Sequence, residues 1–122
     1  MSHFKYFKNK LFIESTSVLN ILKKNNTPFY LYSEKQINEN YSNFAKTFES
    51  IKPLICFAAK ANTNLPIMRM LGKLGSGADV VSGGELLKAL KAGIKPNKIV
   101  FSGVGKTEEE LKLAIRKKIL LI

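Results

Sequence analysis

The sequence predicts an α/β fold in which short parallel strands alternate with helices. Three observations support this: strand-length apolar runs precede segments with helical periodicity, helix start signals lie between them, and the unit repeats about every 20 to 25 residues. Parallel strands with right-handed crossovers can close in two ways, as an open doubly wound sheet or as an eight-unit (β/α)8 barrel. If the fold is a barrel, this chain supplies the N-terminal portion, about half of it.

The N-terminal part carries weaker signals. Residues 1–14 are expected to be loosely ordered and partly extended, and residues 17–25 to form a short helix. Asn26-Thr27-Pro28 ends that helix. The aromatic run Phe29–Tyr32 predicts a strand.

A longer helix is predicted to begin at Ser33. Ser33 and Gln36 have the spacing of a capping box, in which each side chain satisfies a free backbone donor of the first turn. Pro53 lies beyond the end of this helix. Its apolar residues recur at helical spacing and share one face: Ile37, Tyr41, Phe44 and Phe48.

The strand and helix unit then repeats along the remaining sequence. The predicted strands are 54–59, 78–81, 99–102 and 118–122. The predicted helices begin at residues 64, 82 and 107, with Asn64 as the first N-cap and Ser82–Glu85 and Thr107–Glu110 as capping boxes. Because the sequence stops within an apolar strand, we expect the chain to be a truncated form of a longer protein.

Composition narrows the function classes. The chain has 122 residues, 45% of them apolar, which suits one small globular domain without a membrane span. Its net charge of +11 comes from 20 basic and 9 acidic residues, but the lysines are scattered, which disfavours a nucleic-acid partner. Cys56 and His3 are the single cysteine and histidine, so the sequence predicts no metal site, no disulfide and no histidine-based triad. A cytoplasmic enzyme fits these features best.

The strongest candidate for chemistry is Lys60, at the end of the apolar run that begins at Cys56. Burial there would desolvate the amine, lower its pKa and make it a nucleophile toward a carbonyl group, such as that of an aldehyde cofactor. Lys60, the segment 79–82 and Ser102-Gly103 all follow or end successive predicted strands. Barrel enzymes assemble their active sites at this edge of the sheet.

Three segments resemble the motifs of a known family. Residues 57–64 are similar to the cofactor-lysine motif of the barrel-type pyridoxal-phosphate decarboxylases, and residues 77–85 and 99–107 are similar to two further motifs in the same order. The second and third have the form found in the diaminopimelate decarboxylase branch, rather than in its ornithine and arginine relatives. The resemblance covers residues 27–122.

The resemblance implies a (β/α)8 barrel with pyridoxal phosphate as cofactor. Lys60 would hold the cofactor as an imine and would be the catalytic residue, and Asp79 would lie beside the cofactor. The implied reaction is decarboxylation of meso-2,6-diaminopimelate to L-lysine and carbon dioxide, in a homodimer that binds an amino-acid substrate. No metal, nucleic-acid or membrane partner is implied.

The resemblance also implies a division of the chain. Residues 1–32 would form an N-terminal segment whose Phe29–Tyr32 strand joins a C-terminal β-domain absent from this sequence, and residues 33–122 would form the first half of the barrel. The isolated chain would then be inactive, because the phosphate-binding and substrate-binding residues lie elsewhere. Three alternatives remain at this stage: another decarboxylase of the same fold, a non-catalytic remnant or binding protein, and a small basic nucleic-acid binder.

Overall fold

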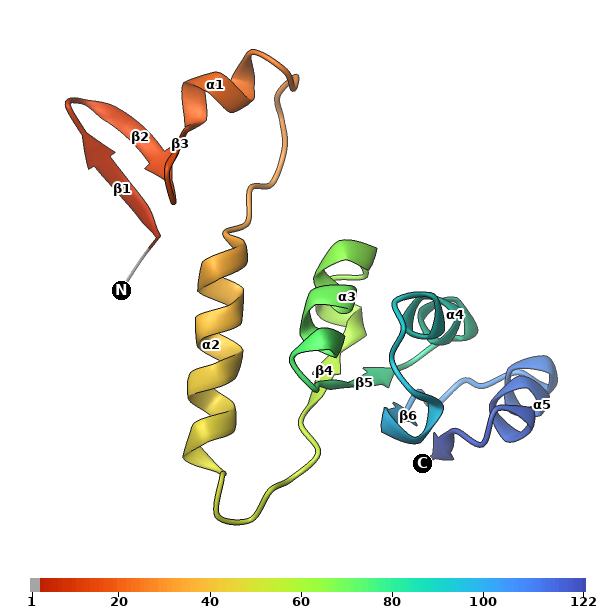
Figure 1. Ribbon diagram of the computed structural model, residues 1–122. Helices are drawn as coiled ribbons and strands as arrows, with labels where there is room; N and C mark the ends of the chain where they lie inside the picture. Colours follow the sequence, from red (N-terminus) through yellow and green to blue (C-terminus); the bar gives the residue numbers. More distant parts are fainter. Residues whose placement is uncertain (1–2) are drawn as a thin grey trace. The chain divides into compact units, whose positions relative to one another are not determined.

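The computed structural model describes residues 3–122, which form two units (Figure 1). One unit ends at Phe44 and the other spans Ala45–Ile122. Among the described residues, no helix is long and apolar enough to cross a membrane.

The first unit begins with an antiparallel sheet of three short strands in the order β1-β2-β3, formed by Phe4–Phe7, Lys10–Ile13 and Thr16–Ser17. Lys8 and Asn9 connect β1 to β2, and their φ angles of 47° and 58° are the positive values that a tight two-residue hairpin needs. The expectation of a loosely ordered segment is therefore wrong for the hairpin. The rings of Phe7 in β1 and Phe12 in β2 meet edge to face, with their centroids 6.4 Å apart.

The short helix predicted in residues 17–25 is present as α1, Val18–Leu22. The strand predicted at Phe29–Tyr32 is not: these residues have no regular secondary structure, and Tyr30 is 90% exposed. A strand forms only where a neighbouring strand pairs its backbone groups, and neither described sheet includes this segment. Its pairing with a strand of another domain stays a prediction.

The long helix α2 spans Glu34–Thr47 and begins where the sequence predicted. The Ser33 hydroxyl accepts a hydrogen bond from Gln36 N at 3.1 Å, but the Gln36 side chain bonds His3 N, so only one half of the predicted capping box forms. Glu14 supplies a further cap, since its Oε1 accepts from Lys35 N at 3.1 Å and from Ser33 Oγ at 2.8 Å. These two bonds lower the pKa of the Glu14 carboxyl below its usual value.

The second unit is a parallel sheet with helices between its strands, as predicted. Its strands occur in the order β4-β5-β6-β7, so strands that follow one another in sequence are neighbours in the sheet. The elements in chain order are β4 (Cys56–Ala58), η1 (Ala59–Ala61), α3 (Leu65–Lys73), β5 (Gly77–Val80), α4 (Gly83–Lys91), η2 (Pro96–Lys98), β6 (Ile99–Phe101), α5 (Glu108–Arg116) and β7 (Leu120–Leu121).

One face of this sheet carries the core. Side chains alternate between the two faces of a strand, and the residues on the helix side of β5 and β6 are almost completely buried. They are Ala78, Val80, Ile99 and Phe101, each at most 1% exposed. Buried side chains from the three helices complete this core, namely Met68, Leu86, Ala89 and Ala114. Figure 1 shows α3, α4 and α5 following one another along the sheet.

The same turn ends all three helices of this unit. After α3, α4 and α5, one residue takes a positive φ, and the next residue's N–H reaches back to a carbonyl in the last turn. The turn residues are Gly75 (φ 101°), Gly93 (φ 89°) and Lys118 (φ 56°). The backbone bonds are Ser76 N to Leu71 O, Ile94 N to Ala89 O and Ile119 N to Ala114 O, at 3.1, 3.2 and 2.9 Å.

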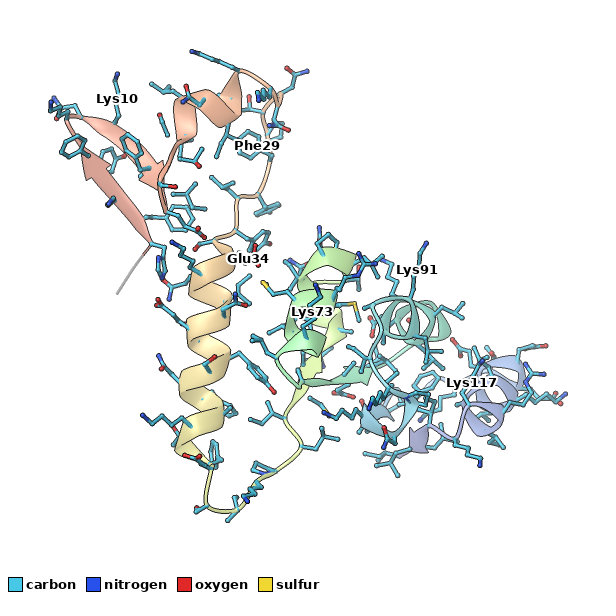
Figure 2. The ribbon with its side chains drawn as sticks, viewed as in Figure 1. Lys10, Phe29, Glu34, Lys73, Lys91 and Lys117 are labelled. Atoms are coloured by element: carbon cyan, nitrogen blue, oxygen red, sulfur yellow. The ribbon has the colours of Figure 1, made fainter. Side chains whose placement is uncertain are left out.

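Part of the positive charge lies near these turns. Figure 2 labels Lys73, Lys91 and Lys117, which stand in the last turns of α3 and α4 and directly after α5. All three are exposed. Cations are favourable at the carbonyl end of a helix, so these lysines have a local structural reason to be there without any polyanionic partner.

Candidate active site

Lys60 lies directly beyond the carboxyl end of β4, in the short helix η1. Ala59 anchors this turn because its side chain is fully buried and its carbonyl accepts from Asn62 N at 3.1 Å. Lys60 itself is exposed, so the expectation that burial desolvates its amine is wrong for this chain. The strand does end at the predicted place, but after the buried Ala59 the chain turns so that Lys60 and Ala61 are exposed.

Asp79 lies one strand further along, on the face of β5 opposite the core. It is level with Ala58 of β4 and Val100 of β6 in the parallel register, and it is half-buried. Its carboxylate Oδ1 accepts a hydrogen bond from the Ser102 hydroxyl at 2.5 Å. The structure thus places Asp79 on the face of the sheet opposite the helices, which we call the open face. It also pairs Asp79 with Ser102, a contact that the sequence did not predict.

The loops after β5 and β6 approach each other closely. Ser102 N donates to Val80 O at 3.0 Å, which extends the pairing of the two strands by one residue. A Cβ atom at Gly103 would lie 2.3 Å from Val81 O, well inside the contact distance of real side chains. Only glycine therefore lets the two backbones meet here, and this approach brings Ser102 to Asp79.

Glu110 joins the beginnings of two helices. Its Oε2 accepts from Thr107 N at 2.8 Å, while Thr107 Oγ1 accepts from Glu110 N at 3.3 Å, so the predicted capping box of α5 is confirmed. Its Oε1 accepts from Gly83 N at 2.6 Å, in the first turn of α4. These backbone bonds, from Thr107 and then Gly83, lower the pKa of the Glu110 carboxyl. A sequence motif describes one helix, so it could not reveal this link to the neighbouring helix.

The other predicted caps form in part. Ser82 Oγ accepts from Glu85 N at 3.3 Å, but the Glu85 carboxylate bonds Val81 N instead of Ser82 N. Asn64 occupies the N-cap position of α3 without a side-chain cap bond, and Asn62 Oδ1 accepts from Asn64 N at 2.9 Å. Both loops are thereby ordered next to the strand ends that carry Lys60 and Asp79.

Cys56 is half-buried at the other end of β4, near Lys98, whose carbonyl oxygen is 3.9 Å from Sγ. Burial raises the pKa of its thiol, and the negative charge of Asp79 raises it further. A thiol with a raised pKa is a poor nucleophile at neutral pH. Cys56 is therefore a weak candidate for a reactive group on this face.

The residues at this edge fit a cofactor with an aldehyde. The η1 segment that carries Lys60 contacts β5, the strand that carries Asp79, and also contacts α4. A primary amine can form a covalent bond to an aldehyde carbon, and a carboxylate can accept a hydrogen bond from a polar group of the cofactor. Within residues 3–122, no group of three or more His, Cys, Asp or Glu residues could hold a metal ion.

Comparison with known proteins decides the family. The family model for the pyridoxal-dependent decarboxylases, pyridoxal binding domain, matches residues 34–122. The chain belongs to this family. Pyridoxal phosphate is the cofactor of the family, and Lys60, Asp79 and Ser102 all lie within the matched residues.

Among curated relatives, diaminopimelate decarboxylase of Aquifex aeolicus is 46% identical over 119 residues, which are 98% of this chain and 28% of the relative. The enzyme of Helicobacter pylori strain J99 is 54% identical over 96 residues, 79% of this chain and 24% of the relative. The chain therefore spans about a quarter of the length of these relatives and corresponds to their N-terminal part.

Solved structures confirm the fold. The crystal structure of AQ1208 from Aquifex aeolicus superimposes with a TM-score of 0.92 at 47% identity, covering 97% of this chain and 29% of that one. Diaminopimelate decarboxylase from M. jannaschii, in co-complex with L-lysine, gives a TM-score of 0.90 at 38% identity, covering 95% and 28%. The parallel strands of the second unit are thus part of a (β/α)8 barrel, and the open doubly wound alternative is excluded.

Proposed function

We propose that the protein containing this chain is a pyridoxal-phosphate-dependent decarboxylase that converts meso-2,6-diaminopimelate to L-lysine and carbon dioxide, a step of lysine biosynthesis. The observation that carries the proposal is Lys60 at the carboxyl end of β4, next to the strand that carries Asp79. The substrate follows from the relatives, since two of the matching solved diaminopimelate decarboxylases, from M. jannaschii and Helicobacter pylori, were crystallised with L-lysine, the product of this reaction.

Each residue has a defined task in this proposal. The Lys60 amine holds the cofactor by a covalent bond to its aldehyde carbon, and the exposed position of Lys60 leaves the amine accessible to it. The Asp79 carboxylate lies on the open face and orients a polar group of the cofactor. Bound pyridoxal phosphate supplies an electron sink for the electrons left when the α-carboxylate departs. Lys60 Nζ would also be placed to carry a proton at the same edge of the sheet.

The proposal extends to the setting of the enzyme. We place it in the cytoplasm as a homodimer that binds a small amino acid, in line with a soluble biosynthetic role. Size-exclusion chromatography with light scattering on the complete protein checks the dimer. A mass corresponding to one chain at micromolar concentration would contradict that part alone.

The decisive experiment traps the cofactor on the complete protein that contains these residues. Pyridoxal phosphate is added, the carbon–nitrogen bond is reduced with borohydride, and the modified peptide is located by mass spectrometry. We expect the label on Lys60, and we expect Lys60→Ala to abolish it. Lys73→Ala is the matched control, because Lys73 is also exposed but lies at the far end of α3. A label on another lysine of the wild type would refute the proposed role of Lys60.

A substrate panel separates the remaining decarboxylase alternatives. Lysine decarboxylase from Selenomonas ruminantium shares this part of the fold with a TM-score of 0.80, at 25% identity. Carbon dioxide release is therefore measured with diaminopimelate, lysine, ornithine and arginine under the same conditions. We expect diaminopimelate to have the highest kcat/KM. A preference for another amino acid would refute the proposed substrate but would leave the proposed cofactor chemistry intact.

A further inference from the structure

Asp79 has little to hold it in place apart from one hydroxyl group. Its neighbours in the register, Ala58 and Val100, have apolar side chains that cannot donate a hydrogen bond. Among the described residues, Ser102 Oγ is the hydrogen-bond partner of the Asp79 side chain, and it contacts Oδ1 at 2.5 Å. The orientation of the carboxylate on the open face therefore depends on Ser102.

Ser102 is itself held by backbone contacts. Its N–H donates to Val80 O at 3.0 Å, and the following Gly103 allows the loop to pass within contact distance of Val81. A serine side chain has one rotatable bond before its oxygen, so a fixed backbone leaves few positions for Oγ. The hydroxyl thus offers Asp79 a donor whose location is set before any ligand binds.

We propose that Ser102 is a positioning residue that holds the Asp79 carboxylate in one orientation, with Oδ1 occupied and Oδ2 directed to the cofactor. This inference rests on the function proposed above. By satisfying one oxygen, the serine restricts the carboxylate to the rotation that presents the other, and the side-chain hydrogen bond that Asp79 makes within residues 3–122 uses Oδ1. A preorganised acceptor avoids the cost of ordering the side chain when the cofactor binds.

A purely structural role for the same bond makes different predictions. The strands β5 and β6 are already joined by their backbone ladder and by the bond from Ser102 N to Val80 O. Removing the hydroxyl alone leaves these contacts in place, so the fold should persist while Asp79 gains freedom. If the hydroxyl only linked the two strands, its removal would instead lower stability and would not change kcat.

The test compares substitutions in the complete protein. Ser102→Ala removes the donor, Ser102→Thr keeps it, and Ser102→Cys replaces it with a somewhat larger group that is a weaker donor. Ser76→Ala is the matched control, because Ser76 Oγ lies within hydrogen-bonding distance of Gly77 O and Ile55 O at the opposite end of β5. Four quantities are measured: the orientation of Asp79 in crystals of the cofactor-free protein, the melting temperature, the label on Lys60, and kcat.

We expect Ser102→Ala to keep the label on Lys60 and an unchanged melting temperature, while Asp79 rotates or becomes disordered. We expect kcat to fall by up to about a hundredfold, as displaced active-site groups can cause. Threonine should restore most of the loss, and cysteine should lie between. Ser76→Ala should lower the melting temperature and keep kcat.

Two results would overturn the inference: a wild-type orientation of Asp79 with wild-type kcat in Ser102→Ala, or a threonine variant as impaired as the alanine variant. A wild-type protein without a label on Lys60 would instead reject the proposed function. The orientation of Asp79 in the cofactor-free crystals would still decide the role of Ser102.

Discussion

The two faces of the parallel sheet in the second unit contrast sharply. On the helix side, Val80 and Phe101 are completely buried and pack among apolar side chains from α3, α4 and α5. On the opposite side, Asp79 and Ser102 alternate with these same residues along the strands, and both remain partly exposed. Adjacent residues of one strand therefore have different roles. The face toward the helices stabilises the barrel segment, and the opposite face carries its polar side chains.

Core packing and polar contacts can therefore be altered separately within β5, a strand of four residues. A substitution on the helix side changes packing, whereas one on the open side changes a polar contact that few other residues share. The alternation of side chains in a strand makes the separation possible. Four measurements test this contrast.

The largest expected effect is loss of core packing. Phe101→Ala removes a fully buried ring and should lower the free energy of unfolding by about 3–5 kcal/mol. Urea unfolding of the complete protein checks this value. The ability of the remaining folded protein to take a label on Lys60 should persist, because the ring lies on the face away from Asp79.

A matched pair of valines provides the control. Val80 and Val100 lie in neighbouring strands on opposite faces, and Val80 is buried while Val100 is partly exposed. Urea unfolding of the 122-residue chain by itself should give a loss of about 2 kcal/mol for Val80→Ala and a clearly smaller loss for Val100→Ala. Equal losses from the two substitutions would show that the open face is packed as tightly as the helix side, and the contrast would fail.

A smaller effect is expected at Glu110, which joins the first turns of α4 and α5. Because its folded-state pKa is lowered, its contribution to stability is complete above the ordinary value of 4.5 and is lost as the pH falls through the lowered value. Glu110→Gln should therefore lower the melting temperature at pH 7. The melting temperatures of variant and wild type should converge as the solution is acidified below pH 4.5.

Glu109→Gln is the control for this measurement, since the neighbouring glutamate makes neither of the contacts to Gly83 and Thr107. It removes the same charge from the same turn of α5. If it changed the pH dependence as much as Glu110→Gln, general charge at the helix start would explain the effect, and the link between the two helices would not.

The smallest effect concerns the open face alone. Asp79 raises the pKa of the Cys56 thiol in addition to the larger effect of burial, so Asp79→Asn should lower that pKa and increase the thiolate fraction. Alkylation of Cys56 by iodoacetamide at pH 8, followed on its own peptide by mass spectrometry, should accelerate by about twofold to fivefold. Asp79→Glu keeps the charge and should react at nearly the wild-type rate. An unchanged rate in the asparagine variant would place Asp79 too far from Cys56 to act on it.

Much of the second unit could be predicted from its sequence, because its signals are local. Apolar runs of strand length, the Thr107–Glu110 capping box and glycines after helices each depend on residues within a few positions of one another. The first unit was harder. The hairpin of β1 and β2 depends on Lys8 and Asn9 taking positive φ angles, and lysine at such a position gives no sequence signal comparable to glycine.

The candidate site was predictable in part for a similar reason. Lys60 and Asp79 stand out because a charged residue ends or interrupts an apolar strand. The hydroxyl of Ser102 and the second carboxylate oxygen of Glu110 act on residues 23 and 27 positions away, and such pairings depend on strand register. The exposure of Lys60 was predicted wrongly, because periodicity shows that a run is apolar but not what covers its end.

The repeated turn after α3, α4 and α5 has a consequence for how this part of the protein tolerates change. The turn is formed by backbone hydrogen bonds and one residue of positive φ, so it does not depend on the identity of the neighbouring side chains. We expect the end of the sheet where these turns lie to accept peptide tags, dyes or altered surface charge, and to be a suitable point for immobilising the protein without blocking the strand ends near Lys60.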